Sequence, residues 1–172
     1  LSVDRMISIQ ESEKIKLYYY NTNKDPELNE IKALLNDASS NTLQKINESV
    51  MNGKISKSSK IINKLIAEGT SPVSILRGLM NYINRIKAAN IEIRKGKDFD
   101  DAVKILTPPL FWKDKDSFRT HCKYWPLFKL EKAINNLVEA EISCKVDSKL
   151  SDLICERIVI QISKEGQLLI KN

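Results

Sequence analysis

The stretch Gly69–Lys95, GTSPVSILRGLMNYINRIKAANIEIRK, carries the strongest fold signal in the chain. Gly69 can end a preceding helix in a left-handed turn, and the hydroxyl of Thr70 or Ser71 can cap a new helix. Pro72 suits the first helical position, where no N–H donor is needed. Since the next strong stop signal is Gly96, the stretch predicts a helix of roughly 24 residues, about 36 Å long.

One broad side of this helix is apolar, which predicts contact with at least two neighbouring helices. Asn90 interrupts that side, and we expect it either to bond a neighbour or to mark where the cover ends. Gly78 costs up to about 1 kcal/mol relative to Ala in mid-helix, and a close helix crossing would explain its presence. The apolar side comprises Ile75, Leu76, Leu79, Met80, Tyr82, Ile83, Ile86 and Ile93.

The rest of the chain also has helical patterning, so the predicted fold class is all-α, a helical bundle. The polar run DASSN at 37–41 predicts a domain boundary, which separates residues 1–41 from residues 42–172. Ile158–Ile162 has strand propensity, but the helical patterns around it favour helix. Helices are expected at 1–20, 27–36, 42–52, 56–68, 98–106, 114–124, 126–146 and 149–164, the last ending at Gly166, with Ile142, Leu150 and Leu153 facing inward.

Three aromatic segments allow two interpretations each. The two prolines of Thr107–Lys113, TPPLFWK, exclude helix, and Leu110, Phe111 and Trp112 are expected to plug into the bundle or, alternatively, to meet a partner helix. Trp125 follows Phe118, His121 and Cys122 at helical spacing, which favours a packed face, although it too is a candidate for a subunit interface. Tyr18–Tyr20 is either a half-buried helix end or a platform for stacking bases.

The bulk composition is that of a globular protein with a basic excess. The 172 residues carry a net charge of +6, which permits an acidic partner such as nucleic acid. Lys far outnumbers Arg, and Asn and Ile are abundant, so codon bias of an AT-rich genome accounts for part of that charge. Cys122, Cys144 and Cys155 have no paired spacing, which favours reduced thiols in a cytoplasmic protein. No apolar run is long enough to span a membrane, and the start without Met suggests a fragment of a longer chain.

No pattern of catalytic or ligand-binding residues emerges from the sequence. It has no phosphate-binding glycine loop, no metal-ligand spacing and no nucleophile elbow. His121 is the single histidine, and Glu139 and Glu141 point about 200° apart on a helix, so neither indicates acid–base catalysis. We therefore expect no catalytic residues, no cofactor and no metal.

Several segments, in this order and spacing, resemble the C-terminal part of the delta subunit of the bacterial DNA polymerase III clamp loader, especially its alphaproteobacterial branch. The N-terminal residues Ser2–Ser8, with Glu13–Ile15 and Leu17–Tyr18, resemble the last long helix of that subunit's lid domain. The resemblance covers essentially the whole chain. Its segments are Ser71–Arg77, Leu106–Lys113 with Phe118–Arg119, Trp125–Leu130, Ala133–Lys145 and Leu153–Arg157.

This resemblance implies a non-catalytic assembly role in DNA replication. Residues 1–41 would be the C-terminal part of an AAA+ lid domain, and residues 42–172 would be the helical collar domain through which clamp-loader subunits assemble. The implied partners are the gamma/tau and delta-prime subunits and, in the full complex, primed DNA. The parent complex is DNA polymerase III, a nucleotidyltransferase holoenzyme. The sliding clamp would be bound by an N-terminal domain preceding Leu1, so this part alone is not expected to bind or open the clamp.

The positive charge supports an alternative function, a basic helical module that binds nucleic acid. It would gather several cations on one surface and would bind with strong salt dependence. The basic residues are spread along the chain, which weakens this alternative on its own. The candidate interface residues are Leu110, Phe111, Trp112 and Trp125, and the candidate nucleic-acid contacts are Arg77, Arg85, Lys95, Lys113, Arg119 and Lys123.

Overall fold

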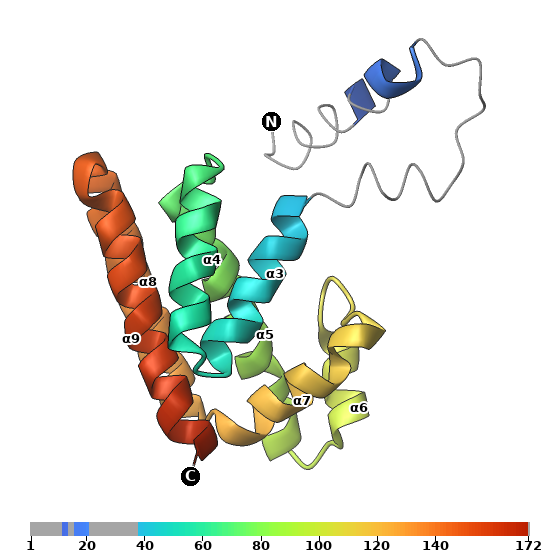
Figure 1. Ribbon diagram of the computed structural model, residues 1–172. Helices are drawn as coiled ribbons and strands as arrows, with labels where there is room; N and C mark the ends of the chain where they lie inside the picture. Colours follow the sequence, from blue (N-terminus) through green and yellow to red (C-terminus); the bar gives the residue numbers. More distant parts are fainter. Residues whose placement is uncertain (1–11, 14–15, 21–37, 172) are drawn as a thin grey trace. The chain divides into compact units, whose positions relative to one another are not determined.

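The computed structural model describes residues 12–13, 16–20 and 38–171, and all secondary structure in these residues is helical (Figure 1). This confirms the predicted all-α class. The chain divides into two compact units, Leu1–Asn41 and Thr42–Asn172. In the first unit residues 16–19 are helical, and Tyr18 and Tyr20 are exposed. The helix expected at 27–36 and most of the one expected at 1–20 lie outside the described residues.

Helix α5, Pro72–Arg94, is the central element of the second unit and has the predicted start. Ser71 has an extended backbone, and its hydroxyl accepts a hydrogen bond from the N–H of Ser74 at 3.2 Å. Gly69, just before it, has a φ of +86°, which is the left-handed conformation that glycine adopts without a steric penalty. Local residue chemistry therefore accounts for where this helix begins.

The apolar side of α5 packs against α6, α7, α8 and α9, which confirms the expected contact with several helices. Asn90 is buried, and its side-chain amide donates to the carbonyl oxygen of Trp125 at 3.0 Å. Of the two expectations for Asn90, the bond to a neighbour is thus correct. The fully buried apolar residues of the helix are Ile75, Leu76, Leu79, Ile83, Ile86 and Ala89.

Helices α3, Ala38–Met51, and α4, Ile55–Ala67, form a hairpin that turns at Gly53 with a φ of +67°. Helix α3 begins at Ala38, so most of the run predicted as a polar boundary is its first turn. Ser and Asn are favoured at helix starts as well as in loops. The composition of this run therefore did not distinguish a helix start from a loop. Asn52, the residue before Gly53, lies in this turn, and its side-chain oxygen lies 3.2 Å from Nε2 of His121.

The segment between α5 and α8 contains short helices around a group of aromatic rings. Its elements are α6 (Phe99–Ala102), η1 (Val103–Ile105), η2 (Trp112–Asp114) and α7 (Lys115–Tyr124). The ring centroid of Phe118 lies 5.8 Å from that of Tyr82 and 6.4 Å from that of Phe99. Asp98 caps α6 by accepting from the N–H of Asp101 at 2.7 Å.

Helix α8, Leu127–Val146, and helix α9, Ser151–Lys171, are joined through η3, Ser148–Leu150. Figure 1 shows α9 running alongside α4, and the two helices are in contact. The helical state of Ile158–Ile162 is as predicted, but α9 does not end at Gly166.

Gly166 is a contact residue and not a helix end. A Cβ atom there would lie 2.8 Å from the carbonyl oxygen of Met51 and 2.9 Å from that of Val50, which is closer than a carbon and an oxygen normally approach. Gly78, for which a close crossing was expected, has more room. Its Cβ would lie 3.9 Å from Cδ2 of Leu43, an ordinary van der Waals distance, so that expectation was wrong.

Candidate interaction surfaces

The loop after η1 exposes two adjacent aromatic side chains. Phe111 is 54% exposed and Trp112 is 72% exposed, and their ring centroids are 5.8 Å apart. The ammonium group of Lys113 lies 5.3 Å from the centroid of the Trp112 ring. Leu110 is half-buried and packs against the core. We call Leu110–Lys113 the aromatic loop.

The expected plug is therefore correct for Leu110 and wrong for Phe111 and Trp112. Pro108 and Pro109 exclude helix here, and the chain then enters the 3₁₀ helix that begins at Trp112. The aromatic rings of the core are Phe118 and Trp125, with the partly buried Tyr82 and Phe99 packed against them. Exposed adjacent aromatic rings are typical of the centres of protein–protein interfaces.

Trp125 has a structural role and is removed from the candidate interface. It is 1% exposed, its indole N–H donates to the carbonyl oxygen of Met51 at 3.0 Å, and its own carbonyl accepts from Asn90. A buried indole needs such a partner for its N–H. Trp125 thus connects the α3–α4 hairpin to α5 from within the core and offers no surface to a partner.

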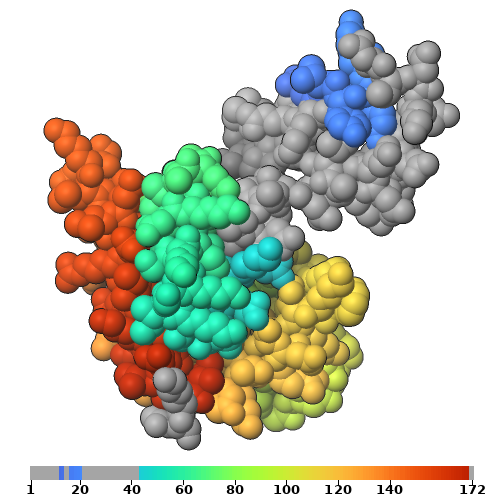
Figure 2. Space-filling view, in the orientation of Figure 1, coloured from blue at the N-terminus to red at the C-terminus, as the bar shows by residue number. Residues whose placement is uncertain are grey.

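A second exposed apolar set lies on the α8–α9 hairpin. Val138, Ile142 and Val146 follow one another at four-residue intervals on α8, which places them about 40° apart around the helix. Figure 2 shows orange atoms of this hairpin projecting at the edge of the second unit. We call this set the α8–α9 ridge; its members are 41–83% exposed and are Val138, Ile142, Val146, Leu150 and Leu153.

This ridge was not predicted from the sequence, where Ile142, Leu150 and Leu153 were expected to face inward; all three are exposed. The side of α8 that is buried comprises small and apolar residues at other angles, namely Leu130, Ala133, Leu137, Ala140 and Cys144. The four-residue spacing of Val138, Ile142 and Val146 was the signal that could have revealed a second apolar stripe on the same helix.

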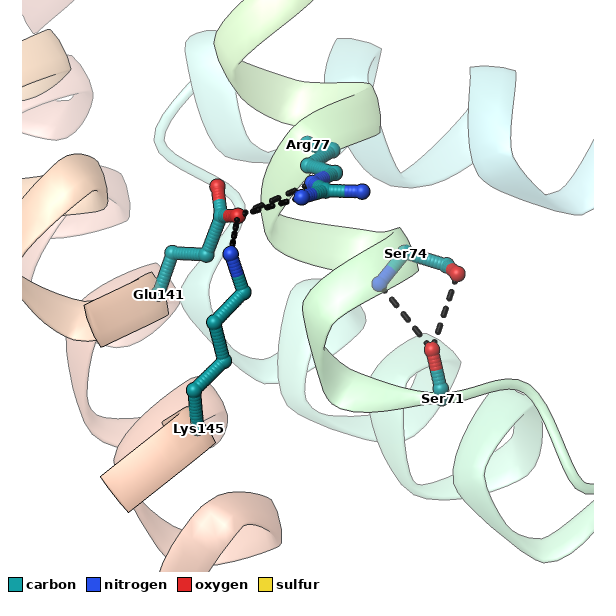
Figure 3. A network of polar contacts seen from close by, with 5 residues as sticks. All are labelled: Ser71, Ser74, Arg77, Glu141 and Lys145. Atoms are coloured by element: carbon teal, nitrogen blue, oxygen red, sulfur yellow. Dashed lines mark hydrogen bonds and ion pairs between the residues drawn. The ribbon is translucent and has the colours of Figure 1, made fainter. Parts of the chain in front are cut away.

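An ion-pair network beside the ridge joins α5 to α8 (Figure 3). Arg77 donates to Oε1 of Glu141 from Nε at 2.9 Å and from Nη2 at 2.7 Å. Lys145 approaches the same oxygen at 2.6 Å. The hydrogen bonds from Arg77 and then from Lys145 lower the pKa of Glu141 below its ordinary value. This arrangement holds Glu141 as a structural carboxylate next to Ile142.

The charged groups of all six predicted nucleic-acid contacts are engaged by other groups of the chain. Arg77, Lys95 and Arg119 pair with Glu141, Glu92 and Asp100, respectively. Arg85 donates to the carbonyl oxygen of Pro108 at 2.9 Å. Lys113 lies over the rings of the aromatic loop.

The sixth, Lys123, lies 5.3 Å from the ring centroid of Tyr124. Arg77 faces α8 while Arg85 faces the loop at Pro108, so these two cations of α5 do not share a partner. The hypothesis of one basic surface built from these six residues stays a prediction, and their internal contacts weaken it.

His121 is part of a buried polar network. Its Nε2 lies 3.2 Å from Oδ1 of Asn52, and its Nδ1 lies 2.9 Å from the hydroxyl of Tyr82. The amide oxygen of Asn52 can only accept, so Nε2 carries the proton and Nδ1 accepts from Tyr82. Burial lowers the pKa of His121 to about 4. The histidine thereby links the α3–α4 turn, α5 and α7.

The described part of the chain lacks two further features. No cluster of three or more His, Cys, Asp or Glu side chains is arranged to hold a metal ion in residues 12–13, 16–20 and 38–171. None of the helices in those same ranges is long and apolar enough to cross a membrane. Cys122, Cys144 and Cys155 are free thiols, and burial raises the pKa of Cys122 and Cys155 to about 12.

Comparison with known proteins identifies one solved structure with the same fold. The Bacillus subtilis DNA clamp loader delta protein (YqeN) matches with a TM-score of 0.64 over 86% of this chain, at 16% sequence identity. The chain spans 43% of the length of that protein. No protein-family model and no curated protein matches the sequence. The chain therefore has a fold like that of a clamp-loader delta protein, and a Bacillus neighbour gives no support to the alphaproteobacterial branch suggested by the sequence.

Proposed function

We propose that this chain is a non-catalytic assembly module of a DNA polymerase III clamp-loader delta subunit, and that it helps load the sliding clamp on primed DNA during replication. The observation that carries the proposal is the structural match over 86% of the chain to a clamp loader delta protein. The ordered sequence segments that resemble the delta subunit support it separately, because that resemblance depends on residue identities and spacing and not on the fold.

In this proposal residues 1–41 are the end of the AAA+ lid domain, and residues 42–172 are the collar domain. The division into Leu1–Asn41 and Thr42–Asn172 is compatible with that assignment. The partners are the gamma/tau and delta-prime subunits in the cytoplasm, and the sliding clamp is bound by another domain of the delta subunit. The chemistry of DNA synthesis belongs to the polymerase holoenzyme and not to this module.

Two exposed apolar surfaces support an assembly role. The aromatic loop offers Phe111 and Trp112, and the α8–α9 ridge offers branched aliphatic side chains along one hairpin. Removing such side chains from water provides about 25 cal/mol per Å² of apolar surface. Large aromatic side chains such as Trp112 are the residues that most often carry the binding energy of an interface, whereas the aliphatic ridge would contribute through the apolar area that it buries.

The proposal is tested by mixing the chain with gamma/tau and delta-prime subunits and measuring the mass of the eluting complex by light scattering on a sizing column. We expect a stable complex that contains all components. Ile142→Glu with Val146→Glu should weaken it at least about tenfold, because the charged groups would be desolvated at the interface.

Phe128→Glu with Leu168→Glu is the matched control, since both residues are exposed apolar positions outside the two surfaces. This variant should assemble like the wild type. Failure of the wild-type chain to form any complex at concentrations of tens of micromolar would reject the assembly role. An intact complex with the Ile142 and Val146 variant would show that assembly does not use the ridge, and the same test applied to Trp112→Ser would then examine the aromatic loop.

A further inference from the structure

An open groove of about 870 Å³ lies where the start of α4 meets the end of α9. Three lysines line it, Lys54, Lys57 and Lys60, together with Ile55, Gln167 and Ile170. In Figure 2 the surface of the α3–α4 turn adjoins the dark red surface of the end of α9. All three lysines are exposed, so their ammonium groups are available to a ligand.

The three lysines differ in their charge pairing from several cations elsewhere in the bundle. Within the ranges that the structure describes, none of them forms an ion pair, whereas Arg77, Lys95 and Arg119 all do. Lysines at three-residue spacing lie about 4.5 Å apart along a helix axis. The groove therefore presents a short row of positive charge at the start of α4, from the N-cap residue Lys54 to Lys60.

The start of α4 adds to this positive potential. The first turn of a helix has N–H groups without intrahelical acceptors, and the helix dipole places partial positive charge there. No side chain caps α4, and its first turn contains no acidic residue. In α5 and α6, by contrast, Ser71 and Asp98 accept from first-turn N–H groups.

We propose that this site, which we call the lysine groove, binds the phosphodiester backbone of a nucleic-acid strand. Three lysines and an uncapped helix start suit successive phosphates, which Lys binds as point charges. Ile55 and Ile170 supply apolar surface for sugars and bases, and Gln167 supplies an amide that can donate and accept. The site differs from the six cations proposed from the sequence and does not depend on the clamp-loader assignment.

The test is fluorescence anisotropy of a labelled single-stranded oligonucleotide over a range of salt concentrations. The variant combines Lys54→Gln, Lys57→Gln and Lys60→Gln. We expect it to weaken binding at least about tenfold and to reduce the slope of log affinity against log salt by about two, since each phosphate contact to a single strand contributes about 0.7. Circular dichroism melting checks that the variant is folded.

The control removes the same net charge through Lys45→Gln, Lys132→Gln and Lys149→Gln, three exposed lysines outside the groove and outside the six candidate contacts. It should change the affinity less than about threefold. Equal weakening in both variants would show that binding follows net charge alone and would overturn the proposal, as would a wild-type chain that does not bind the strand at low salt. Displacement of the strand by inorganic tripolyphosphate at micromolar concentration would also overturn it, because the site would then recognise an isolated polyphosphate.

Discussion

The contact between the α3–α4 turn and α9 differs sharply from the middle of α5, although a helical glycine lies at each place. At the first, the backbones of Gly53 and Gly166 approach so closely that a Cβ on Gly53 would lie 2.2 Å from the backbone nitrogen of Gln167. At the second, Gly78 lies beside a groove and has ordinary space for a methyl group. A glycine inside a helix can therefore mark either a required contact or a tolerated weakness.

The close contact between the α3–α4 turn and α9 also lies beside several buried hydrogen-bonding groups. The carbonyl of Met51 accepts from the indole of Trp125, and the adjacent Asn52 reaches His121. A change that separates the turn from α9 would disturb these hydrogen bonds as well as the packing. The middle of α5 around Gly78 has no comparable set of backbone contacts. The two places should consequently respond in opposite directions to the same substitution.

The largest expected effect is that of Gly53→Ala. The substitution places a side chain at a φ of +67° and drives its Cβ into the backbone of α9. The left-handed backbone costs about 1–2 kcal/mol and the overpacking about 1–3 kcal/mol, so we expect the free energy of unfolding to fall by about 4 kcal/mol. Urea denaturation followed by circular dichroism measures this change.

Gly69→Ala is the matched control for backbone strain. Gly69 also has a positive φ, +86°, but nothing lies within 4 Å of its Cβ position. The free energy of unfolding of the Gly69→Ala variant should therefore fall only by the cost of the left-handed backbone, about 1–2 kcal/mol. Similar losses in the two variants would mean that the contact with α9 is not tight, and would contradict the comparison.

The second-largest expected effect is a loss of stability on acidification. It tests the same turn, because the buried His121 is hydrogen-bonded to Asn52 there. The folded pKa of His121 is lowered from 6.5 to about 4 by burial, so the unfolded chain binds the proton first as the pH falls. Stability should be complete above pH 6.5 and decline as the pH falls toward 4, by up to about 3 kcal/mol, since one pKa unit corresponds to about 1.4 kcal/mol.

Chemical denaturation at a series of pH values measures this decline. His121 is the chain's single histidine, and carboxyl groups titrate mainly below about pH 4.5, so the window between pH 6.5 and 4.5 reports on it. His121→Gln removes the titrating group and should make stability nearly independent of pH in that window. A decline that persists in this variant would assign the effect to other groups.

Local chemistry explains why the sequence predicted the helices well. Ser71, Pro72 and Gly69 act through their own backbone neighbours, and the apolar period of α5 reports directly on its buried side. Gly166 was misread because a glycine that ends a helix and one that permits a contact look identical in sequence. The second requires knowledge of the carbonyls of Val50 and Met51, which lie more than a hundred residues away.

The surfaces were predicted less well, because exposure depends on what the rest of the fold leaves uncovered. Trp112 and Trp125 are the same residue type in neighbouring segments, yet one is exposed and the other fills the core. Charge type identified Arg77 and Arg119 as candidate contacts, but only the fold brings Glu141 and Asp100 beside them. The three lysines of the lysine groove were not singled out for the same reason.

The smallest expected effect, and the one of opposite sign, is that of Gly78→Ala. Alanine is favoured over glycine in a helix interior by about 1 kcal/mol, and the new methyl group would meet only Cδ2 of Leu43 at an ordinary distance. The substitution should therefore raise the free energy of unfolding by about 1 kcal/mol. Gly166→Ala receives the same helix-propensity gain but drives its methyl group into two carbonyl oxygens, at a cost of about 1–3 kcal/mol. Parallel urea denaturation should thus show a clear difference between the two, with Gly78→Ala the more stable; stabilisation by both would mean that the backbone of α9 can move away from the α3–α4 turn at little cost.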